Sequence, residues 1–197
     1  MDFLQAHWLD IVTTVLGLAY ILFEYRASVW MWFVGFMMQS LGIVLYYQKG
    51  LYADCGMEFY YLTMTIYGWW RWTYNGRGSR VESRGAIGHI PIHIVLRWGS
   101  IAFCLWALIF ILLVRFTNST VPLADSFTTA LSVIGIWALA HKYLEQWFVW
   151  IAVDIVTCIL YFYKDIPFKA SLYALYVIIA ILGYRKWKRM MEKTDRD

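Results

Sequence analysis

Charged residues are scarce in this chain of 197 residues: they make up only 15% of it, whereas 61% is hydrophobic and 20% is aromatic. An ordinary soluble domain has roughly 25% charged residues, and a soluble domain of this size cannot bury so much apolar surface. The chain also has only 3 prolines and a net charge of +4, which argues against long disordered segments and against nucleic acid as a partner. The composition therefore predicts an integral membrane protein.

Motifs of metal sites and of enzymes are also missing. The 3 cysteines are isolated and form no CxxC pair, so neither a disulfide framework nor a zinc site is expected. His89 and His93 have the spacing of metal ligands, but Pro91 between them favours a helix start. The motifs of nucleotide-binding loops, serine nucleophiles and zinc proteases do not occur. We therefore expect no metal, no cofactor and no enzymatic activity.

Seven apolar runs are long enough to span a membrane as helices, because a bilayer core of about 30 Å needs roughly 20 helical residues. They cover residues 4–23, 29–48, 51–72, 94–114, 124–141, 145–163 and 167–186. The second, fourth, sixth and seventh runs are the strongest, whereas the first contains Asp10 and the fifth is short. The first ten residues lack the features of a cleaved signal, so the first run is expected to remain as a spanning helix. The predicted fold class is all-α.

Lys and Arg are distributed unequally between the connecting segments. With the N-terminus outside, 13 of the 17 basic residues fall on the inner side and 4 on the outer side. Positively charged loops stay in the cytoplasm, so we expect the N-terminus out and the C-terminus in, with the basic tail near anionic membrane lipid. Trp30, Trp70 and Trp187 lie near helix ends and are expected in the interfacial aromatic belt.

An internal repeat links the two halves of the chain. Residues 11–72 align without a gap on residues 126–187, an offset of 115, with 14 identities in 62 positions. The matches include Trp32-Phe33-Val34 with Trp147-Phe148-Val149, Gly68 with Gly183, and Trp72 with Trp187. Each repeat holds three helices, and the fourth helix restores a common direction, so a parallel 3+1+3 repeat is predicted.

This repeat divides the chain into three parts. Residues 1–74 form the first three-helix repeat, residues 75–122 a basic cytoplasmic loop and a linker helix, and residues 123–197 the second repeat with its basic tail. Internal repeats with a site near the membrane midplane are typical of secondary transporters. An ancient duplication kept only for packing is the alternative.

Gln39 and Asp154 occupy the same position in the two repeats, about ten residues into their helices, which places both near the midplane at about 1.5 Å per residue. They are expected to face each other. A carboxylate at the centre of a membrane helix costs roughly 2.5–3.5 kcal/mol on insertion scales, so Asp154 is a candidate binding residue. A hydrogen bond that joins two helices is the alternative.

Aromatic residues accompany these polar positions. Trp147 and Trp150 lead along one helix face to Asp154, and aromatic rings with a carboxylate behind them suit a flat cationic ring, through stacking and cation–π attraction. Packing or a place in the aromatic belt is the alternative for both tryptophans. The third helix adds Glu58, Tyr61, Trp69 and Trp72.

Two longer motifs carry a resemblance. They are Ile66-Tyr67-Gly68-Trp69 with Trp72, and Lys142-Tyr143-Leu144-Glu145-Gln146-Trp147 with Trp150 and Asp154. The sequence resembles the PnuC family of bacterial vitamin transporters, whose IYGWxxW and KYxExWxxW patterns these segments match, from about residue 10 to residue 187. That family resembles the SWEET sugar transporters in its 3+1+3 helices.

The resemblance implies a uniporter in the bacterial inner (plasma) membrane, working by facilitated diffusion. The expected substrate is nicotinamide riboside, trapped by phosphorylation in the cytoplasm, and a homotrimer is implied. Thiamine, carried by the PnuT subgroup, is the alternative substrate, and other members carry riboflavin. A membrane receptor or assembly protein that transports nothing is the alternative class.

The resemblance also implies which residues contact the substrate. They are Gln39, Tyr61, Trp69, Trp72, Glu145, Trp147, Trp150 and Asp154. Glu58 departs from the family, because many members have Gln at this position. Two carboxylates suit a cationic vitamin better than neutral riboflavin, and they do not decide between nicotinamide riboside and thiamine.

Overall fold

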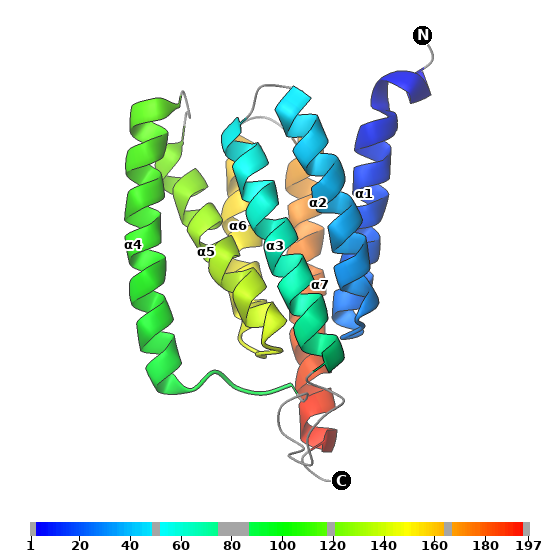
Figure 1. Cartoon of the computed structure of the whole chain (residues 1–197), viewed down its shortest axis with the longest axis vertical. Coiled ribbons are helices and arrows are strands. Elements are labelled where there is room, and N and C mark those ends of the chain that lie inside the picture. The colour runs from blue at the N-terminus through cyan, green and yellow to red at the C-terminus, as the bar shows by residue number, and fades with distance from the viewer. Residues whose placement is uncertain (1–2, 49–51, 75–86, 118–120, 164–166, 195–197) are drawn as a thin grey trace. The chain divides into compact units, whose positions relative to one another are not determined.

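The computed structural model describes residues 3–48, 52–74, 87–117, 121–163 and 167–194, and these residues form seven helices. The helices are α1 (Phe3–Tyr25), α2 (Trp30–Gln48), α3 (Tyr52–Tyr74), α4 (Ile92–Phe116), α5 (Pro122–Ala140), α6 (Gln146–Tyr163) and α7 (Pro167–Thr194) (Figure 1). Each of the seven expected runs is therefore a helix.

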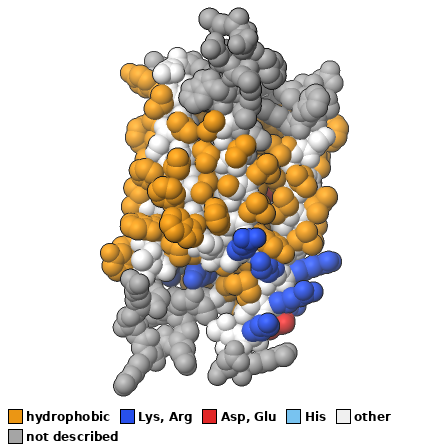
Figure 2. All heavy atoms as spheres, turned by 90° about the vertical axis from the view of Figure 1, so that its right-hand side faces the viewer, with side chains coloured by type: hydrophobic (Ala, Val, Ile, Leu, Met, Phe, Trp, Pro, Cys, Tyr) orange, Lys and Arg blue, Asp and Glu red, His pale blue; other side chains and the backbone are white. Residues whose placement is uncertain are grey.

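Four of the described helices, α2, α4, α5 and α6, are long and apolar enough to cross a bilayer. This confirms three of the runs expected to be strongest, the second, fourth and sixth, and the short fifth run also qualifies. α1 carries a shorter apolar stretch over Val15–Tyr25. On the face drawn in Figure 2, hydrophobic side chains cover the middle of the molecule and Lys and Arg gather below them.

The last helix is longer than expected. α7 continues to Thr194, eight residues beyond the predicted end at 186, because residues 185–194 contain good helix formers such as Lys, Arg, Met and Glu and neither Gly nor Pro. Trp187 lies in this extension and is 0% exposed. The expectation that Trp187 belongs to the interfacial belt is therefore wrong, whereas Trp30 and Trp70 are both exposed.

The described helices form two compact units, α1–α3 and α4–α7. In the first unit α2 packs against both α1 and α3, and in the second α6 packs against both α5 and α7. α4 packs against α5 and has no buried residue along its length (Figure 1). Most of the basic segment expected after the third helix lies outside the described residues.

The turns that precede α2 and α6 share an unusual backbone conformation. Ala27 has φ 49° and Lys142 has φ 56°, in the left-handed region that residues other than glycine rarely adopt. These two residues are 115 positions apart. The two turns thus have the same conformation at the same place in the alignment.

In the first unit α2 and α3 meet where the indole of Trp32 packs against Gly68. A Cβ at Gly68 would lie 2.3 Å from Cη2 of Trp32, so the indole rests directly on the α3 backbone. The Trp32 ring also makes an edge contact with Trp72, with centroids 5.5 Å apart at 88°. Glycine is required here because any side chain would displace the ring.

The second unit repeats this arrangement between α6 and α7. A Cβ at Gly183 would lie 2.4 Å from Cη2 of Trp147, and Trp147 meets Trp187 at 5.6 Å and 89°. All three residues are 115 positions after their counterparts in the first unit. The buried tryptophans of both units therefore make the same kind of contact, an indole on a glycine and an edge-to-face pair.

A contact between a cysteine thiol and a backbone carbonyl also joins the α2–α3 pair and the α6–α7 pair. Cys55 of α3 donates to the carbonyl oxygen of Ile43 of α2 at 3.7 Å, and Cys158 of α6 donates to the carbonyl oxygen of Ala170 of α7 at 3.3 Å. The alignment pairs Ile43 with Cys158 and Cys55 with Ala170. The thiol therefore comes from the third helix of the first unit, α3, but from α6 in the second unit, which aligns with α2. The aligned positions in contact are the same in both units.

Candidate functional site

Gln39, Glu58 and Tyr61 are half-buried in the first unit. The carboxylate of Glu58 lies against Gly42 of α2, where a Cβ would be 2.8 Å from Cδ of Glu58. Gly42 is three residues after Gln39, so the acidic group lies within one helical turn of the Gln39 position. Tyr61 follows Glu58 by one turn of α3. The α2–α3 pair thus brings together Gln39 and Glu58, which the sequence predicted separately.

Asp154 is buried in α6, with 8% of its surface exposed. The side chain of Tyr176 on α7 lies near it. Sequence analysis missed Tyr176 as a candidate site residue, although a signal existed, because the offset of 115 pairs it with Tyr61.

Trp150 lies one turn before Asp154 and covers α5. A Cβ at Gly135 of α5 would be 3.2 Å from two atoms of the indole. In the first unit the glycine and the aromatic residue exchange places. A Cβ at Gly35 of α2, which aligns with Trp150, would lie 3.2 Å from the ring of Tyr20 of α1, which aligns with Gly135. The indole Nε1 of Trp150 is buried and has no hydrogen-bond partner among the described residues.

Trp72 and Trp147 have contacts that account for their burial without a ligand. Trp72 is 6% exposed and Trp147 is 2% exposed, and both take part in the edge contacts that join the helices of their own unit. These contacts agree with the packing alternative that the sequence left open for Trp147.

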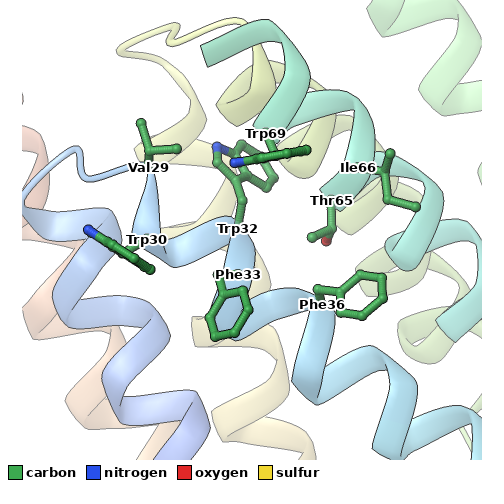
Figure 3. A pocket seen from close by; sticks show the side chains of 8 residues that line it. All are labelled: Val29, Trp30, Trp32, Phe33, Phe36, Thr65, Ile66 and Trp69. Atoms are coloured by element: carbon green, nitrogen blue, oxygen red, sulfur yellow. The ribbon is translucent and has the colours of Figure 1, made fainter. Parts of the chain in front are cut away.

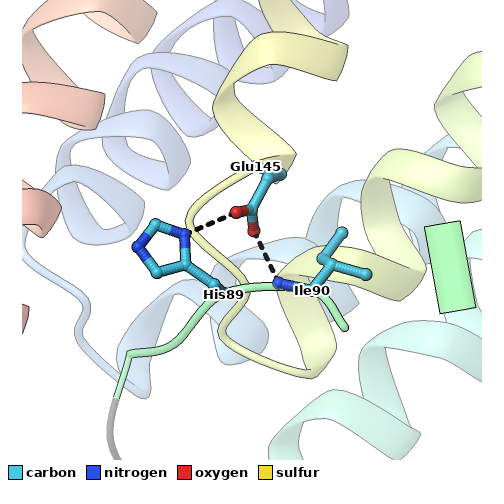
Figure 4. A network of polar contacts seen from close by, with 3 residues as sticks. All are labelled: His89, Ile90 and Glu145. Atoms are coloured by element: carbon cyan, nitrogen blue, oxygen red, sulfur yellow. Dashed lines mark hydrogen bonds and ion pairs between the residues drawn. The ribbon is translucent and has the colours of Figure 1, made fainter. Parts of the chain in front are cut away.

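Glu145 fastens a segment that precedes α4. One of its carboxylate oxygens lies 2.6 Å from Nδ1 of His89, and the other accepts a hydrogen bond from the backbone N–H of Ile90 at 3.0 Å (Figure 4). Gly88 adds two backbone hydrogen bonds, donating to Lys142 and accepting from Leu144. The segment is therefore held along the α5–α6 turn, and His89 pairs with a carboxylate. Among the described residues no cluster of potential metal ligands occurs.

Lys142 forms part of the same turn. Its side chain is half-buried, and burial lowers the pKa of its ammonium group from the ordinary value. His141 and Tyr143 on either side stack at 5.6 Å and 13°. The turn before α6 is thus a packed structure in which both carboxylate oxygens of Glu145 are engaged.

Trp69 lines a pocket of about 490 Å³ between α2 and α3 in the first unit (Figure 3). The other lining residues are Val29, Trp30, Trp32, Phe33, Phe36, Thr65 and Ile66. The pocket is almost wholly apolar, although the Thr65 hydroxyl and the Trp32 Nε1 are buried nearby without partners among the described residues. Trp69 lies eleven residues from Glu58, about 16 Å along α3, so these two predicted contacts are at different depths.

Comparison with known proteins places this arrangement in a family. A family model described as nicotinamide mononucleotide transporter matches residues 7–189. The riboflavin/roseoflavin transporter RibM of Streptomyces davaonensis is 25% identical, over 91% of this chain and 84% of that protein. The nicotinamide riboside transporter PnuC of Escherichia coli is 22% identical over the same shares.

A solved structure has the same fold. The crystal structure of the vitamin B3 transporter PnuC matches with a TM-score of 0.73 at 21% identity, over 95% of this chain and 83% of that chain. The resemblance to the PnuC family, first indicated by the two tryptophan motifs, is confirmed. Since the family model covers nearly all of the 197 residues, the chain belongs to the nicotinamide mononucleotide transporter family and is a multi-pass membrane transporter, not an enzyme.

Proposed function

We propose that this protein carries nicotinamide riboside across the bacterial plasma membrane by facilitated diffusion. The observation that carries the proposal is Asp154, a carboxyl group buried in an apolar helix one turn from the indole of Trp150. An acidic group beside an aromatic ring suits the cationic pyridinium of this vitamin. Relatives from Escherichia coli and Haemophilus influenzae are named nicotinamide riboside transporters, which supports the same substrate.

The proposed architecture is a parallel 3+1+3 repeat with the N-terminus outside and the C-terminus in the cytoplasm. Its support is the set of contacts that recur at an offset of 115: the left-handed turns, the tryptophans on glycines and the thiol contacts. The unequal distribution of Lys and Arg supports the orientation. Phosphorylation in the cytoplasm would then make uptake unidirectional without ion coupling in the transporter.

The proposed substrate contacts differ in role. Asp154 and Glu58 supply negative charge, Gln39 and Tyr61 supply hydrogen bonds, and Trp150 supplies a ring face. The remaining predicted residues, Trp69, Trp72, Glu145 and Trp147, belong to the proposal as residues that shape the path or hold the helices that carry the polar groups. The homotrimer and its contact with membrane lipid are also part of the proposal.

Thiamine is the second candidate, because it also carries a fixed cationic ring and the two carboxylates suit both vitamins. The name of the riboflavin/roseoflavin transporter RibM makes riboflavin a third comparison. Riboflavin is neutral, so burying Asp154 and Glu58 near it would leave their charge uncompensated. The same measurement therefore separates the three vitamins.

The test is substitution of Asp154 by Asn, which keeps the shape and removes the charge. If the carboxylate compensates a cationic ring, affinity for nicotinamide riboside should fall by about 1.5–3 kcal/mol, or roughly 10- to 150-fold. Calorimetric titration of the purified protein with nicotinamide riboside, thiamine and riboflavin measures this. Asp125→Asn on α5 makes the same chemical change away from the proposed site and should leave affinity unchanged. Unchanged affinity in Asp154→Asn with lowered thermal stability would show that Asp154 serves packing.

A further inference from the structure

Gln146, the first residue of α6, is a buried amide without a partner. Its side chain is 0% exposed, and neither Oε1 nor Nε2 has a hydrogen-bond partner among the described residues. A primary amide offers two donors and an acceptor, and most buried polar groups of this kind are bonded. Leaving one unpaired destabilises the folded state. If packing is its only role, Gln146 therefore lowers the stability of the protein at this position.

The first unit shows what packing alone requires at this position. The residue 115 positions earlier is Met31, which is also 0% exposed. Methionine has nearly the same length as glutamine and fills buried space without any hydrogen-bonding group. The second unit thus carries an amide where the matching place in the first is filled by an apolar side chain.

Gln146 also lies on the face of α6 that carries the proposed site. Residues at i, i+4 and i+8 share a helix face, and Gln146, Trp150 and Asp154 have this spacing. The Nε1 groups of Trp150 and of neighbouring Trp147 are likewise buried without partners among the described residues. Eight residues separate the amide from the carboxyl group, about 12 Å along the axis, which is the span of a small molecule with two rings.

We propose that Gln146 is a specificity-determining residue that hydrogen-bonds the neutral, hydroxyl-bearing half of the vitamin, while Asp154 compensates its cationic ring. This inference rests on the proposed function. For nicotinamide riboside the neutral half is the ribose, whose hydroxyl groups both donate and accept, as the amide does. A site built to bond hydroxyl groups discriminates strongly against ligands that lack them.

The test compares two ligands on purified full-length protein by calorimetric titration. Nicotinamide riboside has the cationic ring and the ribose, whereas 1-methylnicotinamide has the same ring without the sugar. Gln146→Met should weaken binding of nicotinamide riboside roughly 5- to 100-fold and leave the affinity for 1-methylnicotinamide unchanged. The thermal stability of the variant should stay equal or rise, since a buried unpaired amide is removed. Met31→Leu in the first unit is the packing control and should change neither affinity.

Two results would overturn the inference. Equal weakening of both ligands would make Gln146 a packing residue, and unchanged binding of the riboside would remove it from the site. Failure of the proposed function looks different, because the wild-type protein would then bind neither ligand. Binding of thiamine but not of nicotinamide riboside by the wild-type protein would also overturn the inference, because the neutral aminopyrimidine half of thiamine bears no hydroxyl group.

Discussion

Substitution of Gly68 by Ala should destabilise the protein, although alanine is the better helix former. The new Cβ would lie 2.3 Å from Cη2 of Trp32, 2.4 Å from Cζ2 and 2.7 Å from Cε2. Carbon atoms pack at about 3.5–4.0 Å, so the indole must retreat by about 1 Å. Trp32 is 1% exposed and its ring also meets the ring of Trp72, so this movement would disturb a second buried contact.

The magnitude follows from two opposing terms. Forcing extra volume into a packed core costs about 1–3 kcal/mol, whereas replacing glycine by alanine within a helix contributes about 0.5–1 kcal/mol of stabilisation. Because the obstructing group is a buried ring and not a flexible side chain, we expect the upper part of the first range, and a net destabilisation of roughly 2 kcal/mol. Gly183→Ala should behave alike against Trp147, where the nearest distance is 2.4 Å.

Thermal and denaturant unfolding of the purified protein measure this effect. Gly56→Ala is the matched control on the same helix, because a Cβ at Gly56 meets nothing within 4 Å, so this variant should be slightly stabilised. Combining Gly68→Ala with Trp32→Leu should cost less than the sum of the single changes, since the pair is in direct contact. If Gly68→Ala and Gly56→Ala shift stability alike, or if the double variant is additive, the contact between α2 and α3 is not as described.

Two further substitutions test local features of the two units. Glu145→Ala should speed hydrogen exchange at the Ile90 amide, measured by mass spectrometry, whereas Glu145→Gln keeps an acceptor and should stay near wild type; loss of vitamin binding in Glu145→Gln with unchanged exchange would instead make Glu145 a substrate contact. Ala27→Gly should raise the free energy of unfolding by about 1 kcal/mol, because glycine adopts a left-handed φ without the penalty that alanine incurs, and a loss of stability would contradict the turn conformation.

The sequence was a good guide to the spans because the length of an apolar run is a local property. All seven expected runs are helices, and most ends agree within a few residues. The end of α7 was missed because hydropathy marks where a helix leaves the membrane and says nothing about whether it continues in water. The family resemblance also followed from the sequence, since the tryptophan motifs are contiguous.

The candidate site could be predicted from the sequence only in part. Asp154 could be singled out because a carboxyl group in an apolar run is conspicuous, and it is 8% exposed; its role as a binding residue stays a prediction. The partners of Glu145 could not be foreseen, because His89 and Ile90 are 56 and 55 residues away in the chain. Gln146 drew no attention, because a glutamine at a helix start is ordinary until its burial is known.

The sequence by itself determined the number of helices in the described residues, the approximate ends of six of them, and the membrane as solvent. Only the tertiary structure decided which face of each helix is buried, and therefore that Trp147 and Trp187 pack against each other while Trp69 lines a pocket. The physical reason is that a helix in a bilayer is apolar on every side. Hydrophobic periodicity then carries little information about its neighbours, and close contacts such as indole on glycine make the choice instead.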